Sequence, residues 1–369
     1  MKKKVVHLTS VHSPNDVRIL HKECRTLADT GYDVTLIAPC SGDNVVSGVK
    51  ITGVPVPSSR LHRMLVTSRQ IFSTALKLNA DVYHFHDPEL IPVGLLLKLH
   101  GKCVIYDSHE NLPGDLLTKE WLHPRLRYAA SKVAATVQTL AVRMFDAVIA
   151  ATAPVAKLFP SQKTAIVQNF PRVEELPPSN QDYQSRGNVA IYVGDITGIR
   201  GAVEMVRAMA AISLSYDPTL LMAGNIYPQQ LERDLQNECG WERVTYVGFC
   251  SRTELPTLLG KARMGLVLLH PVPNLIDAQP VKLFEYLCAG IPIVASDFPL
   301  WRKLVDQVGC GLLVNPLKPD EIAEAICWIL NHPIEAEAMG NRGREAVHRI
   351  FNWDNEARSL LNLYGRILN

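Results

Sequence analysis

The chain has 369 residues, of which 47% are hydrophobic and 20% are charged. This length suits two globular domains, and the composition excludes disordered and fibrous proteins. The formal net charge of +2 excludes a strongly basic nucleic-acid-binding module, so we expect no nucleic-acid partner. No two of the eight cysteines have C-x-x-C spacing, so we expect reduced thiols and no zinc site.

The two halves of the chain differ in charge. Residues 1–170 carry 20 Lys and Arg against 13 Asp and Glu, whereas the rest carries 18 against 23. A basic N-terminal half suits an anionic membrane surface or an anionic acceptor, although ordinary surface charge would explain it equally well. Because no signal peptide or membrane-spanning stretch is evident, we expect a cytoplasmic protein, either free or peripheral on the inner face of the membrane.

The first half alternates predicted strands and helices. Residues 5–9 and 33–38 are apolar and predict strands. Between them, residues 17–31 have apolar side chains at helical spacing and end at Gly31. This strand–helix–strand order predicts parallel strands. Further strands are predicted at 81–86, 103–108, 147–152 and 164–169.

Two stretches of this half, 60–78 and 123–145, are basic and amphipathic. They predict crossover helices that pack on the sheet. The alternative is that an exposed basic and apolar edge rests on a membrane.

A change of composition separates the two halves. Residues 170–188 are rich in proline and polar residues and have no periodicity, which predicts an interdomain linker over 171–188. The strand pattern then restarts, with strands predicted at 189–194, 219–224, 244–249, 264–269, 291–296 and 311–315. We therefore expect two doubly wound, Rossmann-like α/β domains in tandem, over 1–170 and 189–354.

Several motifs of other enzyme classes are absent from the sequence. Neither domain has G-x-G-x-x-G after its first predicted strand, which argues against a dinucleotide-dependent dehydrogenase. There is also no P-loop, no G-x-S-x-G elbow and no D-x-D metal motif. We therefore expect phosphates to be held by helix N-termini and fixed cations, with no metal cofactor.

The most informative segment covers residues 277–296. Gln279 and Pro280 fit the start of a helix, VKLFEYLCA fits its body, and Gly290 fits its end. An ordinary helix start with first-turn charges is one interpretation of this pattern. The other is a binding site for a phosphorylated ligand.

Three charged residues of this segment favour the binding site. Lys282 lies in the first turn beside free N–H groups, which together suit a diphosphate. Glu285 shares a helix face with Lys282, and its carboxylate could accept both hydroxyls of a ribose. Asp277 precedes the helix and could reach a sugar beyond the phosphates.

The segment resembles the Glu-x7-Glu signature of glycosyltransferase family 4, the retaining GT-B enzymes. SDFPLWRKLV, GCGLLVNPLKPDEIAEAI and FNW in the tail fit the same family. HSPNDVRILHKECRTLADTGYDVTLIA, HFHDPEL and YDSHENLP resemble its bacterial surface-polysaccharide branch. The resemblance implies two Rossmann-like domains facing a central cleft, with the acceptor bound by the first and the nucleotide sugar by the second. It also implies that the last helix, about 355–369, returns to the first domain.

The resemblance implies a set of donor-binding residues in the second domain. Lys282 and Arg200 would grip the diphosphate, and Gly194 would let its loop approach the phosphates. Two positions depart from the family pattern, since Asp277 replaces the first Glu and Asp195 stands where Arg is usual. The other donor-binding positions are Phe249, which would meet the nucleobase through its backbone, and Gln279, Pro280, Val281, Leu283 and Glu285.

Candidate residues of the first domain follow its predicted strands. His109 and Glu110 follow strand 103–108, and the resemblance puts His109, as a catalytic residue, near the transferred sugar or its phosphate. Glu110 is expected on the acceptor side. The other acceptor-side candidates are His86 and Asp87 after the preceding strand, and Asn15, Asp16 and Arg18 after the first strand. A structural role remains the alternative for the histidines, and a helix cap for Asp16.

These observations predict a metal-independent enzyme that moves a sugar from a nucleoside-diphosphate sugar to a hydroxyl with retention of configuration. The expected acceptor is a lipid-linked sugar or an oligosaccharide in cell-surface polysaccharide assembly. Two alternatives remain open. One is a nucleotide-sugar epimerase or hydrolase of the same fold. The other is a catalytically silent subunit that binds sugar nucleotides, which Asp195 and Asp277 would favour.

Overall fold

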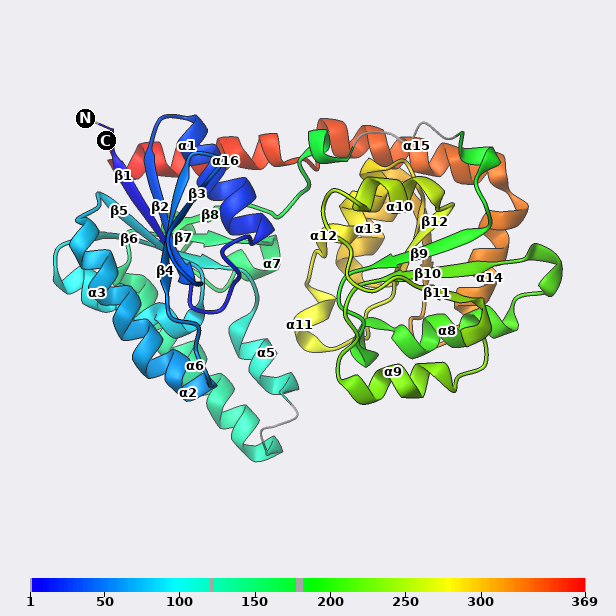
Figure 1. Cartoon of the computed structure of the whole chain (residues 1–369), viewed down its shortest axis with the longest axis horizontal. Coiled ribbons are helices and arrows are strands. Elements are labelled where there is room, and N and C mark those ends of the chain that lie inside the picture. The colour runs from blue at the N-terminus through cyan, green and yellow to red at the C-terminus, as the bar shows by residue number, and fades with distance from the viewer. Residues whose placement is uncertain (1, 120–122, 177–181, 369) are drawn as a thin grey trace. The chain divides into compact units, whose positions relative to one another are not determined.

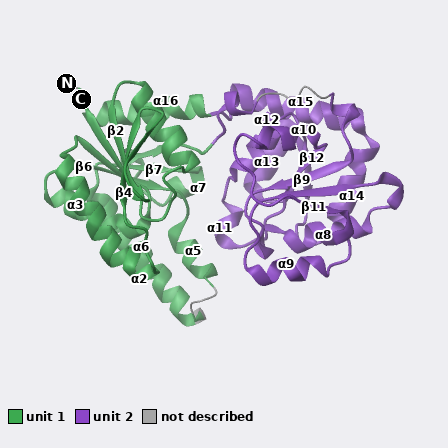
Figure 2. Cartoon of the chain, viewed as in Figure 1, with its two compact units in different colours: residues 1–169, 353–369 green, residues 170–352 purple. Residues whose placement is uncertain are grey.

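The computed structural model describes residues 2–119, 123–176 and 182–368. The chain divides into two compact units, one of residues 1–169 with 353–369 and one of residues 170–352 (Figure 2). The predicted linker 171–188 falls in the second unit and holds the short 3-10 turns η5 (Val173–Glu175) and η6 (Tyr183–Ser185). Its residues 177–181 lie outside the described part of the chain.

Within the described residues, the first unit contains an eight-stranded sheet in the order β3-β4-β2-β1-β5-β6-β7-β8. Its neighbouring strands are parallel, as predicted, except for the antiparallel β3–β4 pair. The strands are β1 (Lys4–Leu8), β2 (Asp33–Pro39), β3 (Asn44–Val46), β4 (Val49–Val54), β5 (Val82–Phe85), β6 (Cys103–Ser108), β7 (Ala147–Ala150) and β8 (Thr164–Ile166).

Helices cover both faces of this sheet (Figure 1). On one face, Ile71, Leu97 and Phe145 belong to a buried apolar cluster; on the other, Leu20 and Leu360 belong to a second. The helical elements are η1 (Val17–Cys24), α1 (Arg25–Asp29), α2 (Arg60–His62), η2 (Arg63–Thr67), α3 (Ser68–Leu78), η3 (Pro88–Leu90), α4 (Ile91–Leu99), α5 (Leu112–Thr118), α6 (Pro124–Met144), α7 (Ala153–Ala156), η4 (Ser161–Lys163) and α16 (Trp353–Leu368).

Two elements of the first unit differ from the sequence prediction. The expected helix over 17–31 begins with η1, a π-helix, and the wide turns bury the charged side chains of Arg18, Lys22 and Glu23. The β3–β4 hairpin was not predicted, because β3 is only three residues long and largely exposed. Its turn uses positive φ angles at Ser47 and Gly48.

The described residues of the second unit form a parallel six-stranded sheet in the order β11-β10-β9-β12-β13-β14. This order reverses direction between β9 and β12, as in Rossmann-like sheets. The strands are β9 (Val189–Val193), β10 (Thr219–Ala223), β11 (Val244–Tyr246), β12 (Met264–Val267), β13 (Ile293–Ser296) and β14 (Gly311–Val314). The remaining helical elements are η7 (Gly198–Arg200), α8 (Ala202–Ala211), η8 (Leu214–Tyr216), α9 (Gln229–Gln236), η9 (Trp241–Arg243), α10 (Leu255–Lys261), α11 (Pro273–Ile276), α12 (Val281–Cys288), α13 (Pro299–Val308), α14 (Pro319–Asn331) and α15 (Pro333–Arg349).

The last helix, α16, packs against the first unit. The indole Nε1 of Trp353 donates to Oγ1 of Thr26 at 2.8 Å, and the Tyr364 hydroxyl lies 2.9 Å from Nδ1 of His84. Both aromatic side chains are fully buried. Among the described residues, no helix is long and apolar enough to cross a membrane.

Candidate functional site

The loop after β9 and the start of α12 hold the predicted donor-binding residues. In open α/β sheets, ligands bind beyond the carboxyl ends of the strands at the point where the strand order reverses. Here that point lies between β9 and β12. Gly194 follows β9 directly, and the side chain of Lys282 reaches it from the first turn of α12. The structure therefore brings these two predicted residues together.

Lys282 has a buried ammonium group without a hydrogen-bond partner among the described residues. Its Nζ lies 3.8 Å from the centroid of the Tyr192 ring. Burial, and then the neighbouring Arg200, lower the pKa of Lys282 well below its ordinary value, against smaller opposing effects of Glu285 and Asp195. An anion bound at Nζ would favour the charged form.

Gly194 makes the room that Lys282 occupies. Its φ is +117°, and a Cβ at this position would lie 2.9 Å from Lys282 Nζ. The next strand is packed equally closely, since a Cβ on Gly224 would lie 2.0 Å from the carbonyl oxygen of Gly194. Neither position has space for a side chain, so both require glycine.

Arg200 is the second predicted cation and belongs to η7. Its Nη1 lies 3.4 Å from Oδ2 of Asp195, and the side chains are 36% and 54% exposed. An exposed pair at this distance is weak. Arg200 can therefore turn to a bound anion, while Asp195, at the position where the resemblance expected Arg, is its loose partner.

Glu285 is paired with a residue that the sequence analysis did not identify. Its Oε1 forms a short ion pair with Nη1 of Arg252, whose Nη2 lies 2.7 Å from Oε2 of Glu175. Glu285 is 6% exposed, so its charge needs such a partner. The predicted ribose acceptor is thus one member of a three-residue ion network, and Arg252 holds one of its oxygens.

The other residues of this segment surround the start of α12. The helix begins at Val281, and Pro280 precedes it without a side-chain cap. Asp277 ends α11, and Trp301 Nε1 donates to the carbonyl of Ala278 at 2.8 Å. The remaining candidates differ in exposure: Gln279 is half-buried, Leu283 lies in the core, and Phe249 is 73% exposed.

In the first unit, His109 is held by a buried carboxylate. Its Nε2 lies 3.0 Å from Oδ2 of Asp107 at the end of β6. Arg18 donates to both oxygens of Asp107 at 3.0 Å. Burial would raise the pKa of Asp107, but Arg18 and His109 hold it well below its ordinary value. The sequence analysis did not identify Asp107, although it ends a strand.

Three of the predicted acceptor-side residues are internal. Arg18, His86 and Asp87 are 4%, 1% and 2% exposed. Burial lowers the pKa of His86 to about 4, so its imidazole is neutral at ordinary pH. Asp87 accepts from the Ser10 N–H at 2.6 Å and contacts His12 Nδ1 at 2.9 Å, which fixes the loop after β1. Their side chains thus position loops rather than offer a surface to an acceptor.

The other three acceptor-side residues lie nearer the surface. Oδ1 of Asp16 accepts from the N–H of Ile19 at 2.9 Å, so Asp16 caps η1, the alternative that its position allowed. Asn15 and Glu110 are exposed.

Two family models match the chain on either side of its unit boundary. Residues 17–167 match the glycosyl transferase 4-like domain, and residues 177–346 match the model of the glycosyl transferases group 1. The chain belongs to the group 1 glycosyltransferases. This membership confirms the family resemblance of the sequence.

Curated relatives of this glycosyltransferase are distant. It is 25% identical over 182 residues to an uncharacterized glycosyltransferase of Methanocaldococcus jannaschii, covering 49% of this chain and 45% of the relative. It is 22% identical over 348 residues to the phosphatidyl-myo-inositol mannosyltransferase of Mycolicibacterium smegmatis, covering 92% and 86%. The matches to the first relatives thus span less than half of their length.

Solved structures show the fold of this glycosyltransferase. Sucrose-phosphate synthase from Thermosynechococcus elongatus matches with a TM-score of 0.81 and 20% identity, over 100% of this chain and 99% of that one. The Anabaena protein HepE in complex with UDP-glucose matches with a TM-score of 0.76 and 14% identity, over 98% and 99%. The predicted GT-B fold of two Rossmann-like domains is confirmed.

Proposed function

We propose that this glycosyltransferase moves a sugar from a nucleoside-diphosphate sugar to a hydroxyl acceptor, with the donor bound by the second unit. The observation that supports this most directly is the buried Lys282 ammonium, which lacks a hydrogen-bond partner beside the backbone of Gly194. Arg200 supplies a second positive charge near it. A bound diphosphate would supply negative charge to both cations.

In this proposal the two cations, rather than a metal ion, stabilise the leaving diphosphate. As the bond between sugar and diphosphate breaks, negative charge grows on the leaving oxygen. Lys282 and Arg200 stabilise that charge, and the uncapped start of α12 adds backbone N–H groups. No enzymic nucleophile is proposed: the acceptor hydroxyl attacks on the face that the diphosphate leaves, so the configuration is retained.

His109 of the first unit has the features of a residue that touches the reacting sugar. Its ring is 20% exposed, whereas its partner Asp107 is fully buried. A carboxylate that holds one ring nitrogen fixes the orientation of the other edge. We assign His109 to contact with the transferred sugar or its phosphate.

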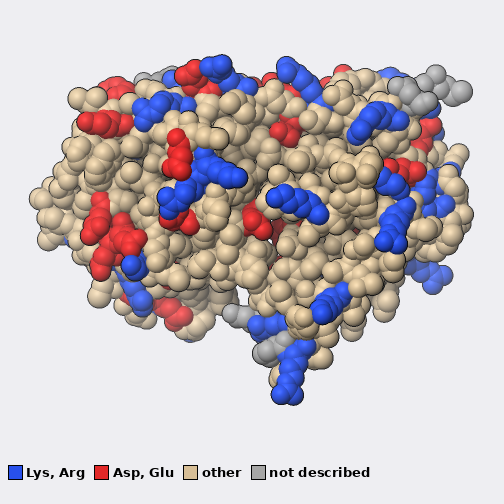
Figure 3. All heavy atoms as spheres, turned by 180° about the vertical axis from the view of Figure 1, so that it is seen from behind, with Lys and Arg blue, Asp and Glu red and all other residues tan. Residues whose placement is uncertain are grey.

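The proposed acceptor is a lipid-linked sugar or an oligosaccharide, reached at a membrane surface. The surface of the first unit supports this, because apolar side chains of η2 and α6 are exposed beside basic ones. Figure 3 shows Lys and Arg side chains at the projecting tip where α6 begins. The exposed apolar residues of α2, η2 and α6 include Leu61, Met64, Leu65, Leu126, Tyr128, Val133 and Leu140. Anionic vesicles should therefore bind the protein.

The activity is tested by product analysis. UDP-glucose and GDP-mannose are suitable first donors, since relatives or neighbours are named with UDP-glucose or as GDP-mannose-dependent. Acceptor-dependent release of nucleoside diphosphate with a retained glycosidic product supports the proposal. Turnover without acceptor would instead indicate an epimerase or hydrolase, and binding without turnover a silent subunit.

Membrane contact is tested by sedimentation with vesicles. Leu61→Glu and Leu65→Glu should reduce binding to anionic vesicles, because each puts a carboxylate on the exposed apolar face. Leu214→Glu is a matched control, since Leu214 is 79% exposed in the second unit. Equal binding by all three variants and the wild type would contradict the proposed membrane contact.

A further inference from the structure

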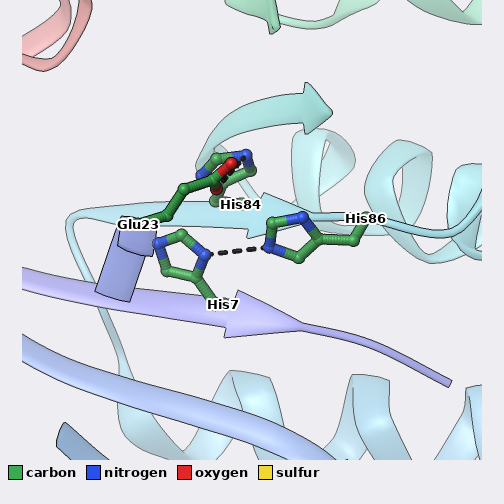
Figure 4. A group of neighbouring side chains, drawn as sticks. All are labelled: His7, Glu23, His84 and His86. Atoms are coloured by element: carbon green, nitrogen blue, oxygen red, sulfur yellow. Dashed lines mark hydrogen bonds and ion pairs between the residues drawn. The ribbon is translucent and has the colours of Figure 1, made fainter. Parts of the chain in front are cut away.

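Four side chains converge in the interior of the first unit, and none has a role in the donor chemistry. Figure 4 shows His7 from β1, His84 from β5, His86 just after β5 and Glu23 from η1 around one point. All are 1% exposed or less. One nitrogen or oxygen from each lies within 4.8 Å of the others. His7 and His84 are register partners in the sheet, so two of the four are fixed by strand pairing.

Each imidazole directs one nitrogen outward to a polar partner. Nδ1 of His86 lies 3.2 Å from Oδ2 of Asp107. The hydroxyl of Tyr364 lies 2.9 Å from Nδ1 of His84 and 3.3 Å from Nε2 of His7. Outer partners of this kind fix the ring orientation of histidines that bind metals through the other nitrogen.

Two of the four inward groups have no hydrogen-bond partner among the described residues. These are Nε2 of His84 and both carboxylate oxygens of Glu23. His84 Nε2 faces Glu23 Oε2 at 3.8 Å. Arg18 Nε lies 3.0 Å from Glu23 Oε1, but it donates its hydrogen to Asp107. Buried polar atoms that face each other in this way need a cation or a proton between them.

We propose that His7, Glu23, His84 and His86 bind one divalent cation of the zinc type. Three imidazole nitrogens and one carboxylate oxygen form a four-coordinate set of the kind that zinc prefers. His7 Nδ1 and His86 Nε2 lie 2.9 Å apart and share one proton. Binding of the ion moves that proton to Nε2 of His7, toward Tyr364, while His86 keeps its own proton on Nδ1, toward Asp107.

Local charge agrees with a cation at this point. With Glu23 ionised, this carboxylate and that of Asp107 lie beside a single guanidinium, that of Arg18. One carboxylate is left without a countercharge, which the ion supplies. All four ligands come from the protein and are buried, so the ion is structural. It ties η1 to β1 and β5, and its ligand His86 contacts Asp107, the carboxylate that holds His109.

The test is zinc binding to the full-length protein. The chain is stripped with a strong chelator, exchanged into chelator-free buffer and titrated with Zn²⁺ against a chelating dye. Bound zinc is counted by mass spectrometry, and the melting temperature is measured with and without it. We expect one zinc ion per chain and a higher melting temperature with zinc, because the ligands are ordered only in the folded state.

Single substitutions locate the ion. His84→Gln and Glu23→Gln should each weaken zinc binding by at least about 10-fold to 100-fold and remove the zinc-dependent rise in melting temperature. His100→Gln is the matched control, because His100 is exposed in the same unit, with Nδ1 on the carbonyl of Leu96 and its ring edge-on to Phe72. Each variant is compared with itself, with and without zinc, so altered basal stability does not affect the result.

Three results would overturn the inference. The first is the absence of stoichiometric zinc in the wild type. The second is equal zinc affinity in His84→Gln and the wild type, together with loss in His109→Gln, which would place the ion at His86, Asp107 and the partly exposed His109. The third is that Glu23→Gln is as stable as the wild type and that zinc changes the melting temperature of neither protein. This result would show that a proton, not a metal ion, lies between Glu23 and His84.

Discussion

The two units bury polar groups with opposite deficits. In the second unit, the ammonium of Lys282 is buried without a hydrogen-bonding acceptor. In the first unit, the carboxylate of Glu23 and Nε2 of His84 are buried without a hydrogen-bond donor, whereas Asp107 accepts from Arg18. An unsatisfied buried group costs free energy. Each deficit therefore indicates a ligand of the opposite charge: an anion in one unit and a cation in the other.

The largest effect is expected from removing the buried cation of the second unit, Lys282. Lys282→Met keeps the length of the side chain but not its charge, and kcat/KM should fall by about 10²-fold or more. The ligand-free variant should melt no earlier than the wild type, because an unpaired buried ammonium is costly. Steady-state kinetics and thermal melting check both parts. Lys303→Met, on an exposed position of α13, is the control.

The same comparison extends to Arg200. Arg200→Ala should also reduce kcat/KM by about 10²-fold, since it leaves a single cation for the leaving diphosphate. Its loose pair with Asp195 contributes little to folding, so the melting temperature should stay within the error of the wild type. Near-normal kinetics in both this variant and Lys282→Met would contradict the assignment of these two cations to the diphosphate.

A smaller effect is expected at Glu285. Glu285→Gln should weaken donor binding by about tenfold to a hundredfold, because charge-assisted hydrogen bonds to the ribose are lost. A 2′-deoxy donor should bind the wild type poorly and lose less from the mutation. Glu238→Gln is a matched control, since Glu238 forms an exposed pair with Arg207 in the same unit.

The ion network offers a competing explanation for Glu285. If this carboxylate serves only to hold Arg252, the variant should melt earlier and lose affinity for both donors equally. Calorimetric titration of nucleoside diphosphate and its 2′-deoxy analogue separates the two roles.

The lowered pKa of Lys282 predicts a pH dependence of stability. Above the lowered pKa and below the ordinary lysine value, the unfolded chain binds one more proton than the folded chain. Unfolding free energy should therefore rise with pH in that window, by up to about 1.4 kcal/mol per unit. Urea unfolding from about pH 7 to about pH 9 checks this against Lys282→Met. Parallel curves for the two proteins would contradict it.

The smallest expected effect is that of a chelator on catalysis. Because protein cations hold the diphosphate in the proposal, activity should persist in excess EDTA. Loss that Mg²⁺ or Mn²⁺ restores would contradict metal independence. Loss that only Zn²⁺ restores, together with a lower melting temperature, would instead reflect the structural ion of the first unit.

Much of the fold was predictable because its strands are short apolar runs between helices of regular spacing. All strands of the second unit were predicted, since buried parallel strands are apolar on both faces. The β3–β4 hairpin was missed because β3 is short and exposed. The π-helical start of 17–31 was missed because spacing alone does not distinguish a π-turn from an α-turn.

The candidate site was predictable where one loop and one helix hold it. Lys282, Gly194 and Arg200 follow strand ends or a helix start, and the structure brings them together. Arg252 and Glu175 lie outside those positions, and their contact with Glu285 depends on tertiary packing.

The histidine cluster could not be predicted from spacing. His7 and His84 are 77 positions apart and meet only because β1 pairs with β5. The absence of C-x-x-C pairs predicted no zinc site, but three histidines on neighbouring strands form no sequence motif. In the same way, the position of Arg18 after the first strand predicted a residue on the acceptor side. In the structure, the π-helix directs its side chain to Asp107 instead.

The central claim is that Lys282 binds the diphosphate of the donor. Calorimetry of UDP and GDP binding tests it most directly. Wild-type protein should bind at least one of them with proton uptake, seen as a binding enthalpy that changes with the ionisation enthalpy of the buffer. Lys282→Met should bind at least about tenfold more weakly and take up no proton, whereas Lys303→Met should match the wild type. Equal affinity and equal proton uptake in Lys282→Met and the wild type would contradict the account.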